Sequence, residues 1–267
     1  PSMSYSCAVF FDGQCDLEAA QMHKVDMLLD KARLNAETHL LEIGCGWGSL
    51  AIRAVRRFGC RVTGITLSQQ QLEWARRAVE EAGLSDRIEI RLCDYRQIEG
   101  LYDRVISCEM LEAVGHEHLG RYFAALQRLL RPHGLAVLQV ITVPDFSYDE
   151  YRASQDWIQK EIFPGALCPS ISAILQAAGR CSELVLEELE NIGPHYARTL
   201  REWRERFLAA WPELQTLGYD ERFRRAWCYY LSYCEAAFAS RNLGDVQMVL
   251  SRPKNSLLLG ENPTWLS

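Results

Sequence analysis

Short apolar runs alternate with amphipathic stretches from Thr38 onward, and this alternation limits the fold more than any other feature of the sequence. The stretch 50–58 has apolar side chains at helical spacing and ends at Gly59, and Ser68 can cap a second helix that ends at Gly83. Strands that alternate with helices form βαβ units, in which helices cover both faces of a parallel sheet. Seven runs are predicted to be strands, namely 39–43, 60–66, 88–93, 103–108, 135–141, 184–190 and 246–251.

Two segments lie outside this alternation. Residues 143–175 contain three prolines among several aromatic side chains, and residues 194–243 have a helical pattern that is rich in aromatics. We therefore predict an α/β fold in which residues 1–267 form one doubly wound, seven-stranded domain. The segments 143–175 and 194–243 are predicted to be helical insertions that cover it.

The composition fits a globular protein of this kind. Of the 267 residues 48% are hydrophobic, and no apolar run approaches the roughly 18 residues that a membrane-spanning helix needs. The net charge of −6 argues against nucleic-acid binding but leaves contact with a membrane surface open. The ten cysteines include no C-x-x-C pair, which favours buried reduced thiols and a cytoplasmic location. No secretory signal is evident, although a further segment could precede Pro1.

The strongest chemical signal is the glycine-rich turn after the first predicted strand, which reads Glu-Ile-Gly-Cys-Gly-Trp-Gly over residues 42–48. Glycine lets a backbone approach a ligand, and open α/β sheets bind ligands at the carboxyl ends of their strands. A dinucleotide site would have the spacing G-x-G-x-x-G, whereas this turn has G-x-G-x-G after an acid. That form suits S-adenosylmethionine, whose amino-acid end needs polar groups. The alternative is a tight turn without a ligand.

Polar residues also follow the second and third predicted strands. Gln71 can donate to and accept from ribose hydroxyls, although Ser68 nearby is explained equally well as a helix cap. Asp94 can accept a hydrogen bond from an adenine amino group while the Tyr95 ring packs on the base. A simple turn aspartate is the alternative.

Several blocks of the sequence resemble, in order and spacing, the cyclopropane-fatty-acid synthase and mycolic acid cyclopropane synthase family. They are residues 3–8 (MSYSCA), 41–48, 66–71, 109–115 (EMLEAVG), 162–170, 191–196 (NIGPHY) and 229–235 (YYLSYCE). The resemblance covers residues 2–252 and implies methyl transfer from S-adenosylmethionine to the double bond of an unsaturated acyl chain, in a phospholipid or similar carrier. The cofactor positions that it implies are Tyr5, Ser6, Glu42, Gly44, Gly46, Gly48, Thr66, Leu67, Ser68, Gln71, Asp94 and Tyr95.

The resemblance also implies a mechanism. The alkene attacks the sulfonium methyl and becomes a carbocation, and a base then removes a proton so that a cyclopropane closes. In the family a bound bicarbonate is thought to be that base, and the positions here are Cys7, Glu112, Gln139, Ile141 and Tyr196, with a hydrogen bond expected between Glu112 and Tyr196. Many members have a histidine where this chain has Gln139, which can donate to an anion but does not titrate near pH 7.

Three further features have less specific interpretations. Cys234 matches a cysteine formerly regarded as catalytic in such enzymes, yet its place on an apolar helix face predicts a raised pKa and an unreactive thiol. Aromatic rings can stabilise the cation, but ordinary core packing explains them as well. No metal site is expected at His116-Glu117-His118, because a third ligand at useful spacing is missing.

Two other functions stay open. A related group of methyltransferases modifies the nitrogen of small amines with a similar core, and a non-catalytic ligand-binding domain could use the same fold. The block around Glu112 and the helix around 229–235 favour the lipid branch. The expected partners are an unsaturated acyl lipid and a membrane surface, which the protein would contact peripherally. A homodimer is one option. The acyl chain, its carrier and the choice between a ring and a methyl branch are not determined.

Overall fold

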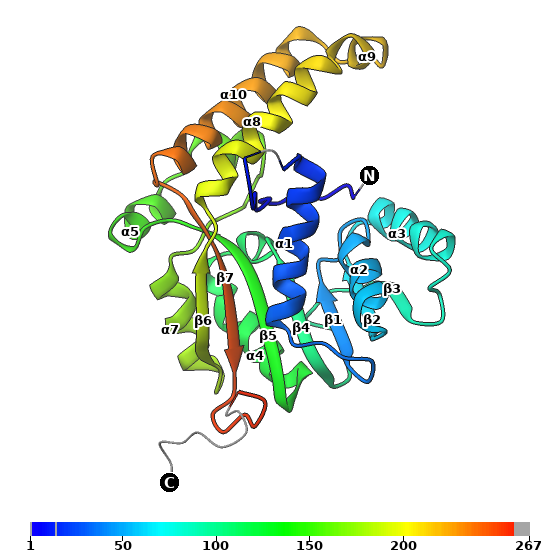
Figure 1. The fold of residues 1–267 in the computed structure, drawn as a ribbon. Helices are drawn as coiled ribbons and strands as arrows, with labels where there is room; N and C mark the ends of the chain where they lie inside the picture. The colour runs from blue at the N-terminus through cyan, green and yellow to red at the C-terminus, as the bar shows by residue number, and fades with distance from the viewer. Residues whose placement is uncertain (1, 14, 259–267) are drawn as a thin grey trace.

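The computed structural model describes residues 2–13 and 15–258, and its centre is a seven-stranded sheet with helices on both faces (Figure 1). The strand order is β3-β2-β1-β4-β5-β7-β6. All seven predicted strands are present. Their bounds are β1 (His39–Ile43), β2 (Arg61–Thr66), β3 (Ile88–Leu92), β4 (Tyr102–Cys108), β5 (Leu130–Thr142), β6 (Val185–Asn191) and β7 (Gly244–Ser251).

One strand departs from the expected parallel arrangement. β7 runs antiparallel to both of its neighbours, and its first residue, Gly244, pairs with Thr142 at the end of β5. The chain reaches β7 from the helices beyond the carboxyl ends of the other strands, so β7 enters the sheet from that edge (Figure 1). The parallel βαβ arrangement therefore holds for β1 to β5 and does not extend to β7.

Two hydrophobic cores hold the helices to the sheet. Side chains of α1 (Leu17–Lys31), α2 (Ser49–Phe58) and α3 (Gln69–Glu81) share one core, and those of α4 (Leu119–Leu129) and α7 (Ile171–Cys181) share the other. The predicted helix signals are confirmed. Gly59 ends α2 with a φ of 67°, and the Ser68 hydroxyl accepts a hydrogen bond from the Gln71 backbone at the start of α3.

The predicted insertions lie beyond the carboxyl ends of the strands (Figure 1). The segment 143–175 contains α5 (Asp145–Ala153), α6 (Trp157–Glu161) and the first residues of α7, which belongs to the sheet layer. The segment 194–243 forms α8 (Pro194–Ala209), α9 (Trp211–Thr216) and α10 (Glu221–Ala239), and α8 packs along α10. Two short 3-10 helices, η1 (Leu111–Ala113) and η2 (His116–His118), follow β4.

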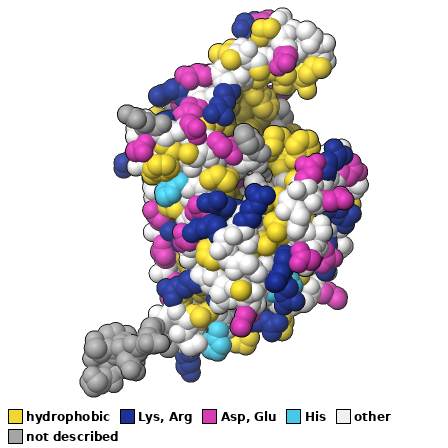
Figure 2. Space-filling model, turned by 45° about the vertical axis from the view of Figure 1, so that its right-hand side comes forward, with side chains coloured by type: hydrophobic (Ala, Val, Ile, Leu, Met, Phe, Trp, Pro, Cys, Tyr) yellow, Lys and Arg dark blue, Asp and Glu magenta, His cyan; other side chains and the backbone are white. Residues whose placement is uncertain are grey.

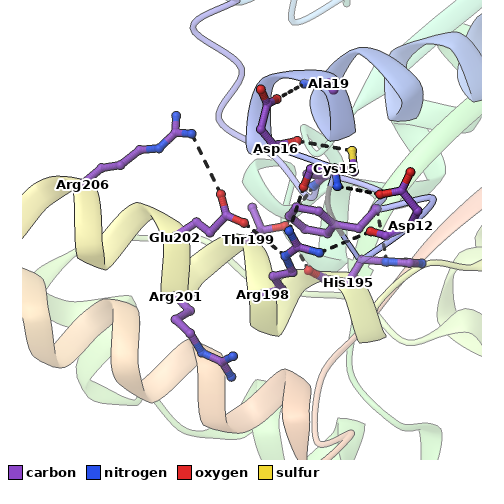
Figure 3. A network of polar contacts seen from close by, with 12 residues as sticks. Asp12, Cys15, Asp16, Ala19, His195, Arg198, Thr199, Arg201, Glu202 and Arg206 are labelled. Carbon is purple, nitrogen blue, oxygen red and sulfur yellow. Dashed lines mark hydrogen bonds and ion pairs between the residues drawn. The ribbon is translucent and has the colours of Figure 1, made fainter.

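The N-terminal segment is fastened to α8, as Figure 3 shows. The Arg198 guanidinium donates to the Cys15 carbonyl at 2.7 Å and lies 3.9 Å from the centre of the Phe10 ring. The Ala8 backbone N–H donates to the Thr199 hydroxyl at 3.2 Å. These contacts hold the residues just before Ala8 at the carboxyl edge of the sheet.

Truncation of Leu126 tests the second core. This α4 side chain is fully buried against the sheet, so Leu126→Ala should lower the free energy of unfolding by about 2–5 kcal/mol. Urea denaturation followed by circular dichroism gives the value, and Leu217→Ala, at a side chain that is 74% exposed, is the matched control. A change at Leu126 no larger than that at Leu217 would contradict this packing.

Candidate active site

The glycine-rich turn joins β1 to α2, and its three glycines have φ values of 80°, 51° and 89°. Such left-handed values favour glycine at each position. A Cβ atom at Gly44 would lie 3.2 Å from Met110, and one at Gly48 would lie 3.2 Å from Ala75. Nothing in the described chain lies within 4 Å of a Cβ at Gly46. The turn therefore packs closely against neighbouring residues at Gly44 and Gly48, whereas the backbone at Gly46 faces open space.

Polar residues surround this turn at the ends of β1 and β2. Glu42 is buried, and burial raises its pKa to about 8. The Thr66 hydroxyl donates to the Gln71 side-chain carbonyl at 2.8 Å, which orients that amide beside the turn. Leu67 is largely exposed, so its side chain can cover a ligand only from outside. These positions fit a cofactor with a polar end, and their contact with it stays a prediction.

The residues predicted to contact adenine have partners of their own. The Asp94 carboxylate pairs with Arg96 at 2.5 Å, and this guanidinium lowers the pKa of the carboxyl. The Tyr95 ring packs edge-on against Tyr122, with ring centres 5.3 Å apart. Both residues lie after β3, in the same turn as Arg96. The Asp94 carboxylate is therefore oriented by its hydrogen bonds to a neighbour in that turn.

The N-terminal segment brings Tyr5 and Ser6 to the same edge. The Tyr5 ring stacks on Trp203 with centres 4.8 Å apart, and its hydroxyl lies 2.8 Å from that of Tyr230. The Ser6 hydroxyl accepts a hydrogen bond from the buried Lys24 ammonium at 2.6 Å. Sequence reasoning missed Lys24, although a lysine on the apolar face of a helix is a recognisable signal.

The main feature of the site is the carboxylate of Glu109, which follows β4 directly. Its Oε1 accepts hydrogen bonds from the Cys7 backbone N–H at 2.8 Å and from Gln139 Nε2 at 2.7 Å. Its Oε2 accepts from the Tyr196 hydroxyl at 2.6 Å. The backbone of Glu109 has a φ of 48°, a left-handed conformation that costs an L-residue about 1–2 kcal/mol. Three donors from distant parts of the chain thus meet one carboxylate.

The predicted hydrogen bond between Glu112 and Tyr196 was wrong. Glu112 lies on η1, and its Oε1 accepts a hydrogen bond from the Ile141 backbone N–H at 2.5 Å. The turn after β4 therefore sends Glu112 toward the end of β5, while Glu109 faces α8 and takes the Tyr196 hydroxyl. Burial, and then the charge of Glu109, raise the pKa of Glu112 to about 8.

The third carboxyl of the cluster comes from β7. Gln139 Nε2 also donates to Asp245 Oδ2 at 3.1 Å, and Gln247 Nε2 donates to Gln139 Oε1 at 3.1 Å. Burial, and then the charge of Glu109, raise the pKa of Asp245 well above its ordinary value. Sequence reasoning missed Glu109, Asp245 and Gln247. Their signal was a polar side chain within, directly before or directly after a run predicted to be a buried strand.

The thiols of Cys7 and Cys234, the two cysteines of the predicted site, are poorly suited to act as nucleophiles. Burial raises the pKa of Cys234 to about 12, which agrees with the expectation of an unreactive thiol. Burial also raises the pKa of the Cys7 thiol, and Cys7 meets the site through its backbone N–H. Elsewhere, His116 Nδ1 lies 2.8 Å from the Tyr148 hydroxyl.

Aromatic side chains from both insertions pack close to the carboxylates. The Leu167 backbone N–H donates to the Glu112 carbonyl at 2.8 Å, so the segment 143–175 touches the site directly. Phe163 packs edge-on against Tyr230, and Tyr196 stacks on Phe238. In Figure 2, hydrophobic side chains line a recess beneath the projecting hairpin of α8 and α10.

Two cavities of about 450 and 170 Å³ lie elsewhere, beside α5, α7 and the start of β7. An acyl tunnel beside the cofactor therefore stays a prediction.

Comparison with known proteins decides the family. The model of the family described as mycolic acid cyclopropane synthetase matches residues 1–248. The chain belongs to this family. The crystal structure of the mycolic acid cyclopropane synthase CmaA1 complexed with SAH and CTAB aligns with a TM-score of 0.87 at 28% identity, covering 94% of this chain and 91% of that one. The predicted seven-stranded methyltransferase sheet is thereby confirmed.

Two curated relatives are similar along most of the chain. The tuberculostearic acid methyltransferase UfaA1 of Mycobacterium tuberculosis is 47% identical over 94% of this chain and 60% of its own length. The cyclopropane-fatty-acyl-phospholipid synthase of Escherichia coli is 39% identical over 94% of this chain and 63% of its own length. The chain thus spans about three fifths of the length of these relatives. A coclaurine N-methyltransferase structure at 22% identity shares the fold alone.

Gly46→Val tests the cofactor assignment. A branched side chain would occupy the open space in front of the turn and should weaken S-adenosylmethionine binding at least tenfold, or by ~1.4 kcal/mol. Isothermal titration calorimetry measures the affinity. Gly83→Val is the control for backbone strain, because Gly83 also has a positive φ with nothing within 4 Å of a Cβ. Unchanged affinity in a folded Gly46→Val protein would refute the assignment.

Glu112→Gln tests the buried carboxyl by its effect on stability. The pKa of Glu112 rises from 4.5 to about 8 on folding, so between these values the unfolded chain releases a proton that the folded protein keeps. This carboxyl therefore lowers the free energy of unfolding as the pH rises through that window, and glutamine does not. Urea denaturation from pH 5 to 8 should show the variant gaining stability relative to the wild type.

The same substitution at the exposed Glu80 serves as the control for the loss of a surface charge. A difference between Glu112→Gln and the wild type that does not change with pH would show that Glu112 is hydrated in the folded protein.

Proposed function

We propose that this protein transfers the methyl group of S-adenosylmethionine to the double bond of an unsaturated acyl chain in a phospholipid or similar lipid, giving a cyclopropane. The observation that carries the proposal is a carboxylate cluster at the sheet edge next to the glycine-rich turn, in which Glu112 and Asp245 are buried and the partly buried Glu109 takes three hydrogen bonds. Aromatic side chains pack beside it. Family membership supports it, as do the names of the two curated relatives, a tuberculostearic acid methyltransferase and a cyclopropane-fatty-acyl-phospholipid synthase. For the amine-methylating alternative, the coclaurine N-methyltransferase structure shares only the fold with this chain.

The surroundings of the carboxylates suit a carbocation. The rings of Tyr5, Trp203 and Tyr230 lie in contact beside the site, and a cation over an aromatic face is stabilised by roughly 0.5–2 kcal/mol. The side chains of α8, α10 and the segment 143–175 keep water away, so that the cation is not captured as an alcohol. S-adenosylmethionine supplies the electrophilic methyl group, and the polar residues around Gly46 would hold it.

The bicarbonate that the family resemblance implies does not fit this arrangement. The Cys7 N–H, the Gln139 amide and the Tyr196 hydroxyl, which were expected to hold the anion, all donate to Glu109. The Ile141 N–H, the remaining main-chain donor of that set, donates to Glu112. No step of the proposed reaction is therefore assigned to bicarbonate.

The outer surface fits substrates that reside in a membrane. Within residues 2–13 and 15–258, no helix combines the length and apolar character needed to cross a bilayer. Contact from the cytoplasmic side is proposed through large apolar side chains exposed on the insertions. These are Phe146, Phe163, Leu208, Leu217, Tyr219, Tyr229 and Tyr233. A homodimer is compatible with this arrangement but is not needed for it.

Lipid analysis tests the proposal. Expression in a bacterial host that lacks its own cyclopropane synthase should add the mass of one CH₂ group to unsaturated acyl chains, as measured by mass spectrometry of extracted lipids. Glu112→Gln should reduce the product by roughly 10²-fold, because an acid–base group of the enclosed site is lost. Glu80→Gln should leave the yield unchanged.

Methylation of small amines with unchanged lipids would replace the lipid proposal by the amine alternative. S-adenosylmethionine binding without turnover on any lipid or amine would favour a binding domain.

A further inference from the structure

Three hydrogen-bond donors in the centre of the site share one acceptor, which is the side chain of Glu109. The Cys7 N–H, Gln139 Nε2 and the Tyr196 hydroxyl lie 2.8, 2.7 and 2.6 Å from the Glu109 carboxylate oxygens. A carboxylate and a bicarbonate ion share a planar O–C–O group with one negative charge. A set of donors arranged for one of these anions therefore accommodates the other, but not both together.

The backbone holds Glu109 in this position. The residue directly follows the last residue of β4, and its N–H donates to the Gln139 carbonyl at 2.7 Å. Its positive φ is an unfavourable conformation for an L-residue, and such residues concentrate at functional sites. The chain thus accepts local strain where the carboxylate enters the cluster.

The charges around Glu109 leave room for one anion. Glu112 and Asp245 face it from η1 and β7, and both have raised pKa values to which the charge of Glu109 contributes. Lys24 is the buried cation beside the cluster, and it interacts with Glu109 as well as with Cys108. Arg104, the other buried cation within residues 2–13 and 15–258, donates to the backbone carbonyls of Ala32 and Asp103. A second anion beside Glu109 would therefore have no further cation to balance its charge.

We propose that Glu109 replaces bicarbonate as the base of the reaction, an inference that rests on the proposed function. After the methyl group has left the sulfonium and formed a bond to one alkene carbon, the other carbon carries the positive charge. A C–H bond of the transferred methyl group then breaks, its electron pair forms the bond that closes the ring, and the proton moves to a Glu109 oxygen. The neutral acid returns the proton to solvent before the next turnover.

Turnover with and without bicarbonate tests this assignment. In buffer freed of carbon dioxide, the purified wild-type protein should keep its rate of S-adenosylhomocysteine release on unsaturated phospholipid vesicles within twofold of the rate with bicarbonate. Glu109→Gln, which fills the same space without a base, should lose about a hundredfold at either condition. Glu109→Gly suits the left-handed backbone and should lose as much, but should regain activity when bicarbonate is added.

A binding measurement keeps the test independent of turnover. The ¹³C resonance of labelled bicarbonate should broaden with Glu109→Gly and should stay sharp with the wild type and with Glu109→Gln. Circular dichroism confirms that each variant is folded, and Glu80→Gln is the control that should match the wild type throughout. Broadening by the wild type would overturn the proposal, whether or not the protein is active.

The failures of the two proposals are distinguishable. A wild-type rate that falls tenfold without bicarbonate, or a fully active Glu109→Gln protein, would overturn the role of Glu109 while the proposed function stands. A wild type that modifies no lipid would overturn the proposed function, and the binding measurement would still decide which anion the three donors hold.

Discussion

The partly buried Glu109 carboxylate is the constraint on which the rest of the site depends. A charge removed from water needs partners, and this one takes them from the N-terminal segment, from β5 and from α8. Segments far apart in the chain are thereby fixed to one point at the edge of the sheet. Tyr196 links this point to the helical hairpin, because it donates to Glu109 and also belongs to the hydrophobic cluster of α8 and α10.

The antiparallel strand β7 completes this arrangement from the side. Because it enters the sheet at the carboxyl edge, its first residues stand opposite the last residues of β5, where Ile141 pairs with Asp245 and Gln139 with Gln247. The Asp245 carbonyl then accepts hydrogen bonds from the Ile192 and Gly193 backbones, at the start of α8. The antiparallel direction of β7 thus brings the Asp245 carboxyl and the Gln247 amide to the site. It also places the backbone carbonyl that holds the start of α8, the helix that carries Tyr196.

Much of this could be read from the sequence, and the limits have physical causes. Apolar runs located all seven strands, because the strands inside the sheet are buried on both faces and even the exposed edge strand β6 keeps such a run. The G-x-G-x-G spacing located the turn. The residues expected around the anion do meet, with Cys7, Gln139 and Tyr196 within hydrogen-bonding distance of one acceptor. The acceptor itself was missed, because a left-handed φ at Glu109 leaves no periodic signal and decides which of two nearby glutamates faces α8.

The fastening of the N-terminal segment to α8 has a consequence for water. The residues that present the Cys7 N–H to Glu109 are held by the Ala8–Thr199 hydrogen bond and by Arg198 across Phe10. Any local opening that detaches this segment also removes a donor from the Glu109 carboxylate and lets more water reach it. The exchange rate of a single backbone hydrogen, that of Cys7, therefore reports how often this segment leaves Glu109 and the carboxylate gains water.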